Sequence, residues 1–277
     1  MSPSVVADGA EPDLEYAAVR DGDACDMRFG TAAVFRACFA SRTITLLEGS
    51  RDDPPMLDHL LFDHVFPRVL AAEALLVLHG SLVAIDGRLA VFIGETGAGK
   101  STLGASLHAR GHRLLGDDAV IVTEQGGAFF GAAVYPSLRL YPDSIGRLLG
   151  EDADTAPMAA YSDKRHVTGF RAAASDAPPL PIACIFSLAG GEDQPAIRPH
   201  SARLACMTML EQSFALDPGD VRAASGRLAA AARLASASAC FELDVPHDYD
   251  RLPETHRLIE AAMAAAAGAQ QDKEPTR

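Results

Sequence analysis

The stretch Gly94-Glu95-Thr96-Gly97-Ala98-Gly99-Lys100-Ser101 decides the fold. It matches G-x-x-x-x-G-K-[ST] at every fixed position and follows the apolar run from Leu89 to Ile93. Glycines let the backbone turn so that its N–H groups surround phosphate oxygens, and the N-terminus of a following helix adds partial positive charge. We therefore expect a phosphate-binding loop (P-loop) between a buried strand and a helix. The alternative is a glycine-rich turn that only joins the two elements.

The residues on either side support this interpretation. Ser81 to Ile85 and Leu89 to Ile93 flank Asp86-Gly87, a pattern typical of a β-hairpin. After the loop, residues 101–110 have the pattern of a helix that ends at Gly111. Further strands are expected over residues 112–115, 119–123, 128–134 and 182–188.

The rest of the chain predicts a layered α/β protein. Residues 14–48 read as a small β layer, and apolar spacing predicts a helix over 56–78 that bends near Pro67. Further helices are expected over 143–149, 203–214, 221–237 and 258–267, with an irregular connection over 150–181. We expect an α/β fold with a mixed sheet around the P-loop, a small β-rich N-terminal portion and C-terminal helices. The predicted units are an N-terminal part over 1–78, a P-loop domain over 79–268 and a disordered tail over 269–277.

Composition excludes several classes of protein. The 277 residues carry 24 Lys and Arg against 37 Asp and Glu, a formal net charge of −13. Such a chain is unsuited to non-specific binding of nucleic acid or anionic membranes. We find no apolar run long enough to span a membrane and no targeting segment, so we expect a cytoplasmic protein. The five cysteines are far apart and predict neither a disulfide framework nor a zinc site.

The basic residues suggest how phosphates would be held. Lysine is scarce in this chain, and Lys100 within the P-loop would reach the β- and γ-phosphates while the Ser101 hydroxyl would bind Mg²⁺. Further positive charge could come from Arg139 or from Lys164, of which Lys164 is preferred; the alternative is that both are solvated surface residues. The predicted nucleotide-binding residues are Gly94, Thr96, Gly97, Ala98, Gly99, Lys100, Ser101, Thr102, Lys164 and Arg139.

An acidic pair follows the P-loop helix closely. Asp117 and Asp118 come after the apolar pair Leu114-Leu115, so one carboxylate could hold a metal while the other accepts a proton from an attacking hydroxyl. Gly-Asp-Asp is also good turn chemistry, and the dipeptide alone does not decide between the two. His79 taken alone is better explained as a strand-end histidine without a catalytic part than as a catalytic residue.

A resemblance to a known family favours catalytic roles for these residues. The segment from His79-Gly80-Ser81 through the P-loop to Arg110-Gly111-His112-Arg113-Leu114-Leu115-Gly116-Asp117-Asp118 resembles the catalytic core of the HPr kinase/phosphorylase family over about 40 residues. The resemblance implies that Asp117 corresponds to the catalytic carboxylate that deprotonates the acceptor serine. It further implies that Asp118 supports Asp117 or the metal, and that His79 lies beside the transferring phosphate.

The chain also departs from that family. It lacks the glycine-rich signature associated with docking HPr and with the reverse reaction, and its first 75 residues do not resemble the usual regulatory domain. It is more similar to shortened HPr-kinase-like proteins that accompany peptide-modification clusters, some of which phosphorylate the C-terminal serine of lasso-peptide precursors.

The resemblance therefore implies a kinase that uses ATP and Mg²⁺ to phosphorylate a serine hydroxyl of a peptide or small protein. Catalytic roles are expected for Asp117, His79 and Asp118, and metal binding for Ser101 and Asp118. Two alternatives are a nucleotide-binding regulatory protein without phosphoryl transfer and a kinase for a small metabolite. Self-association into a homo-oligomer is plausible by the same resemblance.

Overall fold

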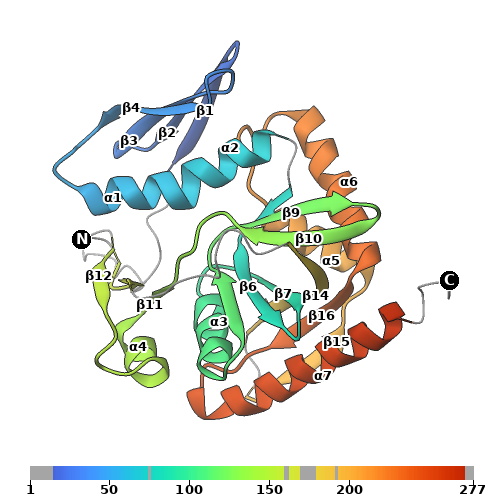
Figure 1. Ribbon diagram of the computed structural model, residues 1–277. Coiled ribbons are helices and arrows are strands. Elements are labelled where there is room, and N and C mark those ends of the chain that lie inside the picture. The colour runs from blue at the N-terminus through green and yellow to red at the C-terminus, as the bar shows by residue number, and fades with distance from the viewer. Residues whose placement is uncertain (1–14, 74–75, 159–161, 169–178, 191–192, 272–277) are drawn as a thin grey trace, which may run out of the picture.

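The computed structural model describes residues 15–73, 76–158, 162–168, 179–190 and 193–271. The chain forms a four-stranded N-terminal sheet, a nine-stranded mixed sheet and a small three-stranded sheet, with helices around the larger sheet (Figure 1). The strands are β1 Tyr16–Asp21, β2 Ala24–Phe29, β3 Ala33–Cys38, β4 Thr43–Gly49, β5 Leu76–Leu78, β6 Gly80–Ile85, β7 Arg88–Ile93, β8 Arg113–Gly116, β9 Val120–Gln125, β10 Ala128–Ala133, β11 Arg139–Leu140, β12 Thr155–Pro157, β13 Arg165–Val167, β14 Leu180–Ala189, β15 Ala196–Pro199 and β16 Ala239–Asp244. The helices are α1 Pro54–His59, the π-helix η1 Leu60–Val65, α2 Phe66–Ala72, α3 Lys100–Ala109, α4 Pro142–Leu148, α5 Ala202–Glu211, α6 Val221–Ala237, the 3-10 helix η2 Tyr249–Arg251 and α7 Leu252–Gln271.

The larger sheet is mixed. Its strands follow the order β5-β9-β10-β14-β7-β6-β8, and β14 also pairs with β16, which pairs with β15. Strand β14 runs parallel to both β7 and β16, whereas the other pairs in this sheet are antiparallel. The predicted α/β fold with a mixed sheet is therefore confirmed.

The two faces of this sheet bury alternate residues of the same strands. Val83, Ile85 and Phe92 pack into a core with side chains of α3 and α7, whereas Leu82 and Val91 pack into a second core with side chains of α5 and α6. Because successive side chains of a strand point to opposite faces, each strand contributes to both cores. The result is three layers, with the segment between β7 and α3 at one end of the central sheet (Figure 1).

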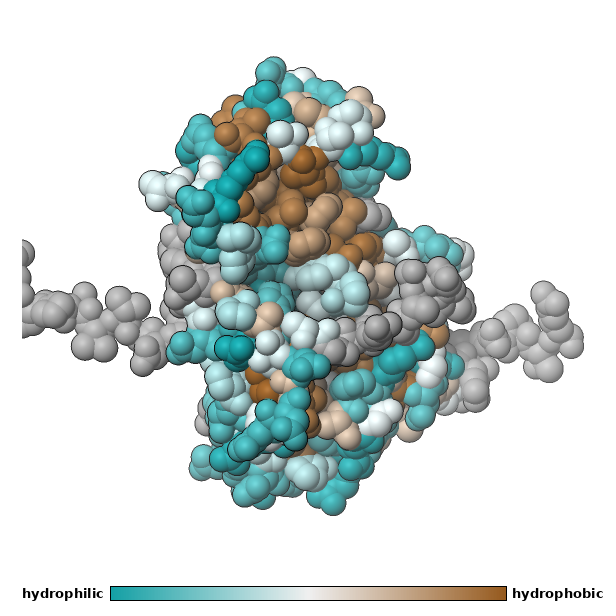
Figure 2. Space-filling view, turned by 60° about the vertical axis from the view of Figure 1, so that its left-hand side comes forward, coloured by the Kyte–Doolittle hydropathy of each residue, from teal (hydrophilic) through white to brown (hydrophobic). Residues whose placement is uncertain are grey.

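The N-terminal sheet has its own apolar core. Its strands pair in the antiparallel order β1-β2-β3-β4. Met27, Phe29 and Phe35 of the sheet pack in one buried cluster with Leu60 and Val65 of the helical segment. The hydrophobic side chains visible in the upper half of Figure 2 belong to the region where Figure 1 places this sheet and the helices beneath it. The helical segment therefore lies between the N-terminal sheet and the rest of the molecule.

The expected helix over 56–78 is wrong in two respects. The helical segment ends at Ala72, and Leu76–Leu78 forms strand β5, which pairs with β9. The irregularity lies before Pro67, in the π-helix η1, where the backbone N–H of Phe66 donates to Leu61. A proline provides no N–H for the preceding turn and its ring crowds the carbonyl four residues earlier, so a widened turn before it relieves the conflict.

Three other expectations also need correction. The connection over 150–181 is not wholly irregular, because β12 and β13 pair within it and with β11. Strands β15 and β16 were not predicted, and helix α7 runs from Leu252 through Gln271 rather than over 258–267. The start of the expected tail is thus helical, while residues 272–277 lie outside the described part of the chain, as do residues 1–14. The helices that the structure describes include none that is long and apolar enough to cross a membrane.

Candidate active site

A cavity of about 440 Å³ opens beside the glycine-rich segment. One wall is the loop before α3 and the first turn of that helix, and the opposite wall is the segment that follows β16. The cavity is lined by His79, Thr96, Gly97, Ala98, Gly99, Lys100, Ser101, Thr102, Leu103, Asp118, Arg139, Leu140, Tyr141, Asp143, Ser144, Lys164, Val245, Pro246, His247, Asp248, Tyr249 and Leu252. The structure therefore brings most of the predicted site residues to one place; Gly94 and Asp117 do not line the cavity.

The glycine-rich segment has a backbone conformation that depends on its glycines. Gly94, Gly97 and Gly99 all have positive φ angles, which residues with a side chain rarely adopt. Gly99 is the N-cap of α3, so the helix begins at Lys100 with its N-terminal N–H groups beside the cavity. The Lys100 ammonium is buried and donates to the carbonyls of Gly94 (2.7 Å) and Glu95 (2.9 Å). The lysine thus lies folded over its own loop.

Strand register brings His79 and the acidic pair to this loop. In the β6–β7 hairpin Gly80 pairs with Ile93, so His79 lies next to the start of the loop. On its other side β6 pairs with β8, and the Gly80 N–H donates to the Asp118 carbonyl at 3.3 Å. Any side chain at position 80 would meet the Phe92 carbonyl oxygen at 2.5 Å, so only glycine fits between these strands. Burial, together with the nearby Lys100 charge, lowers the pKa of His79 to about 4, which keeps the imidazole neutral at pH 7.

Asp117 lies beneath the cavity wall. It is 1 % exposed, and its Oδ1 accepts a hydrogen bond from the Ser81 hydroxyl. Ser101 also stabilises the charged form of this carboxylate and so lowers the pKa of Asp117, whereas Oδ2 is buried without a hydrogen-bond partner. Burial, and secondarily the charge of Asp118, raises the pKa of Asp117 to about 6.

Asp118 has the opposite electrostatic surroundings. Although burial disfavours its charged form, the Arg139 guanidinium holds the pKa of Asp118 below its usual range. Arg139 Nη2 lies 2.5 Å and Nε 3.1 Å from Asp118 Oδ2. The backbone of Asp118 has a φ of 73°, a left-handed conformation that is uncommon for residues with a side chain, although Asp adopts it more readily than most.

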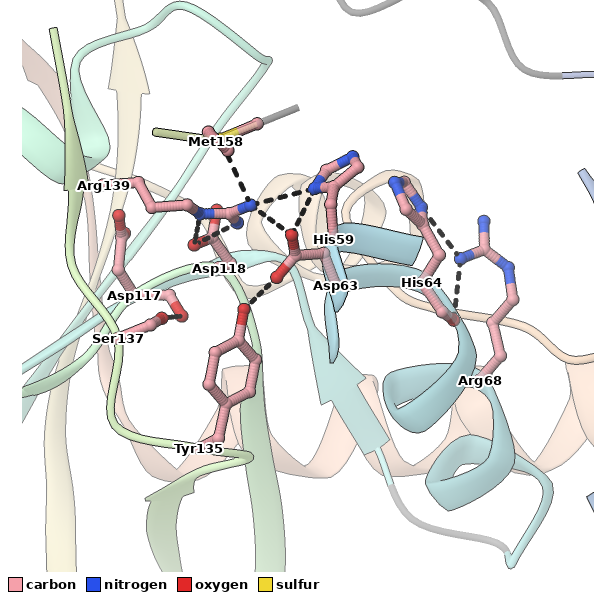
Figure 3. Close-up of polar contacts among 10 residues, drawn as sticks. All are labelled: His59, Asp63, His64, Arg68, Asp117, Asp118, Tyr135, Ser137, Arg139 and Met158. Carbon is pink, nitrogen blue, oxygen red and sulfur yellow. Dashed lines mark hydrogen bonds and ion pairs between the residues drawn. The ribbon is translucent and has the colours of Figure 1, made fainter. Parts of the chain in front are cut away.

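Arg139 also contacts the helical segment before the larger sheet (Figure 3). Its Nη1 pairs with Asp63 of η1, and Asp63 also contacts the His59 ring and the Tyr135 hydroxyl. The predicted cation at position 139 does line the cavity, but two carboxylates already neutralise it. Sequence reasoning did not identify His59, Asp63 or Tyr135. Nothing in a helical apolar pattern links His59 or Asp63 to a residue some 75 positions later, and Tyr135 follows strand β10 without a motif that marks it.

Lys164 reaches the cavity from the segment before β13, with its ammonium 5.6 Å from the centre of the Tyr141 ring. Beside the first turn of α3, the Thr102 and Ser144 hydroxyl oxygens lie 3.4 Å apart, and the Ser144 hydroxyl oxygen is 2.7 Å from that of Tyr249. The sequence analysis missed Ser144 and Tyr249. Ser144 lies in the first turn of α4 and Tyr249 begins η2, and neither carries a motif that would have marked it.

The donor set fits a nucleoside triphosphate and its metal ion. The loop offers helix N-terminal N–H groups and an ammonium. The Asp117 carboxylate, one oxygen of which is buried without a partner, interacts with Ser101, the residue type that binds Mg²⁺ in P-loop proteins. The described residues contain no group of three or more His, Cys, Asp or Glu side chains placed to bind a metal by themselves. Mg²⁺ suits such a site, because it is usually held by one or two carboxylates together with substrate phosphates.

Comparison with known proteins points to one family. Residues 70–138 match the model of the HPr Serine kinase C-terminal domain. The chain is 41% identical over 58 residues to an HPr kinase/phosphorylase of Mycoplasmopsis pulmonis, covering 21% of this chain and 19% of that protein. It is 40% identical over 72 residues to an HPr kinase/phosphorylase of Burkholderia lata, covering 26% of this chain and 22% of the relative. The resemblance to the HPr kinase family is thereby confirmed over the segment that contains the loop, His79 and the acidic pair. The matched segments cover about a fifth of the length of these two relatives.

A solved structure was also found. It is described as the Hpr(Ser) kinase/phosphatase from Coxiella burnetii, with a TM-score of 0.35 and 13% sequence identity, over 70% of this chain and 98% of that chain. The two chains as wholes therefore superpose only loosely.

Proposed function

We propose that this protein is a kinase that uses Mg²⁺-ATP to phosphorylate a serine hydroxyl of a peptide or small protein. The observation that carries the proposal is the meeting of a glycine-rich phosphate loop with a histidine and an acidic pair around one cavity. The segment that supplies these residues is the one similar to HPr kinases. A glycine-rich turn that only connected a strand to a helix would have no need of the buried acidic pair behind it.

The surroundings of each residue suggest its role in phosphoryl transfer. The loop amides and Lys100 would bind the phosphates, and Lys100 would exchange its two carbonyl partners for phosphate oxygens. Asp117, with a pKa raised to about 6, would accept the proton of the acceptor hydroxyl. Asp118 would remain ionised and support the metal or Asp117, and neutral His79 would lie beside the transferring group. Bound Mg²⁺ would neutralise phosphate charge.

A second assignment for Asp117 is supported by its contact with Ser101. In P-loop proteins a carboxylate beside the loop Ser or Thr holds Mg²⁺. Asp117 occupies that place, while Asp118 lines the cavity. The two assignments differ in what Asp117→Asn does: loss of a base leaves the Mg²⁺ requirement unchanged, whereas loss of a metal ligand raises it.

The acceptor we propose is the C-terminal serine of a lasso-peptide precursor. Support comes from the similarity to shortened HPr-kinase-like proteins and from the absence of the glycine-rich HPr-docking signature in the sequence. Lys164 beside the cavity could pair with the terminal carboxylate of such a peptide.

The test is incubation with Mg²⁺ and γ-labelled ATP in the presence of a Ser-ending precursor peptide, the same peptide with a terminal alanine, and an HPr protein. Label on the Ser-ending peptide alone supports the proposed acceptor. Label on HPr alone supports kinase activity but removes the peptide assignment. Label that appears only as free phosphate argues for a nucleotide switch or a different acceptor such as a small metabolite.

A further inference from the structure

Two carboxylates, buried Asp63 and partly buried Asp118, hold the Arg139 guanidinium from different sides. Nε and Nη2 face Asp118, at 3.1 and 2.5 Å, and Nη1 faces Asp63 (Figure 3). Arg139 is 4 % exposed and Asp63 6 % exposed, so both charges are removed from water. A buried ion pair of this kind is stable only if its remaining hydrogen-bonding capacity is satisfied.

Asp63 is itself held in place. Its Oδ1 accepts from the Tyr135 hydroxyl and its Oδ2 contacts His59 Nδ1, one helical turn earlier. His59 Nδ1 also lies 3.0 Å from Arg139 Nη1, so the His59 ring contacts both members of the ion pair. Asp63 is therefore held by the Tyr135 hydroxyl at one oxygen and contacted by His59 at the other, and it cannot easily follow a guanidinium that moves.

Asp63 comes from outside the segment that resembles HPr kinases, which spans residues 70–138. It lies on η1, whose Leu60 and Val65 are buried in the core of the N-terminal sheet. The route from that sheet to the cavity thus runs from η1 through Asp63 to Arg139 and Asp118.

We propose that Asp63 is a positioning residue that fixes the Arg139 guanidinium beside Asp118, so that the N-terminal sheet and its helices complete the active site. A planar guanidinium bound by one carboxylate can still pivot about that contact, whereas a second carboxylate on another nitrogen fixes its plane. The proposed kinase activity supplies the kinetic consequence of this inference, and the geometry can be tested without it.

The variants are chosen to separate positioning from folding. Asp63→Asn keeps the shape and removes the charge that holds Nη1. Tyr135→Phe is a milder change that removes one donor to Asp63 and leaves the carboxylate in place. Asp26→Asn is the matched control, because it breaks a two-bonded Asp–Arg pair with Arg36 (2.6 and 2.7 Å) in the N-terminal sheet, away from the cavity.

The first readout needs no nucleotide. In ¹⁵N spectra of the full-length protein, the Arg139 Nε–H should give a separate, slowly exchanging signal, because this group is buried and bonded to Asp118. Asp63→Asn should shift or broaden it and speed its exchange, Tyr135→Phe should do so less, and Asp26→Asn should leave it unchanged. If both variants fold and neither changes the Arg139 signal, the proposal is overturned. If Asp63→Asn does not fold, an unchanged signal in Tyr135→Phe overturns it.

The second readout is steady-state turnover of Mg²⁺-ATP, counted as γ-phosphate transferred or released. Asp63→Asn should lower kcat by about 10²-fold, the scale of a small misplacement of a catalytic group, with KM for ATP nearly unchanged. If kcat of Asp63→Asn falls only as far as its folded fraction falls, Asp63 has a merely structural role and the proposal is overturned. The same holds if kcat of Asp26→Asn falls by as much as that of Asp63→Asn. If the unmodified protein shows no turnover, the proposed function fails, while the NMR result still decides whether Asp63 positions Arg139.

Discussion

Asp117 and Asp118 are consecutive in the chain, yet their carboxylates have opposite surroundings. Asp117 is covered by protein and has one oxygen without a partner, which raises its pKa to about 6. Asp118 faces the Arg139 guanidinium, which lowers its pKa. Paired acids whose pKa values are driven apart are a common arrangement for a base beside a permanent anion.

Replacing each acid by its amide should have different effects. Asp117→Asn should reduce phosphoryl transfer by about 10²- to 10⁴-fold, the range for loss of a general base, and leave the dissociation constant for ATP nearly unchanged. Asp118→Asn leaves Arg139 facing an amide and should weaken nucleotide binding or folding as well, because one partner of a buried ion pair is lost. Calorimetric ATP titration and transfer assays on both variants check this. Near-normal transfer by Asp117→Asn would show that it is not the base.

The pH dependence of transfer should follow Asp117. With a pKa of about 6 the carboxylate is ionised above that pH, so kcat/KM should fall as the pH drops through about 6. Ser81→Ala removes a hydrogen bond to the charged form and should therefore move this acid limb to higher pH. A pH–rate profile of both proteins tests the prediction. A midpoint that does not move upward in Ser81→Ala would count against Asp117 as the titrating group.

Lys100→Met should weaken ATP binding by about 10- to 100-fold, because charge-assisted hydrogen bonds contribute about 1.5–3 kcal/mol. The methionine keeps the buried stem and removes the ammonium that lines the cavity. Arg28→Met is a suitable control, since Arg28 pairs with Glu48 on the exposed N-terminal sheet. Fluorescent nucleotide titration measures the change. Equal affinity for ATP in both variants would remove Lys100 from the phosphate site.

The hairpin that aligns His79 with the loop should depend on Gly87. Gly87 has a φ of 77° and open space around it, so Gly87→Ala adds backbone strain without a clash and should cost about 1–2 kcal/mol of unfolding free energy. Gly226→Ala is the matched control: it lies inside α6 with open space and should stabilise by about 0.5–1 kcal/mol. Denaturant unfolding of both proteins measures the two shifts. A neutral Gly87→Ala would show that the turn tolerates a side chain there.

The elements that local chemistry specifies could be predicted from the sequence. The hairpin at Asp86-Gly87, the helix ending before Gly111 and the helix over Val221–Ala237 agree with the structure. These elements carry turn, cap or periodicity signals of their own. Strand β16 was missed because it is short, half-buried at several positions and defined by its neighbours β14 and β15.

The site was also predictable only in part, because some of its residues are close in sequence and others are brought in by tertiary packing. The glycine-rich loop, His79 and the acidic pair are close in sequence and are brought together by two adjacent strand pairings. Asp63 and Tyr249 reach the site from distant elements through tertiary packing, which no spacing rule encodes. The sequence also could not predict that Asp117 is buried while Asp118 lines the cavity, since a dipeptide does not reveal which carboxylate faces the cavity.

The measurement that tests the central claim most directly follows the γ-phosphate of labelled ATP with Mg²⁺ and a set of peptides bearing terminal or internal serine. The account predicts acid-stable phosphoserine on a peptide, lost in Lys100→Met and in Asp117→Asn. Label that remains on ATP or appears only as inorganic phosphate with every peptide, from a folded protein that binds ATP, would contradict it.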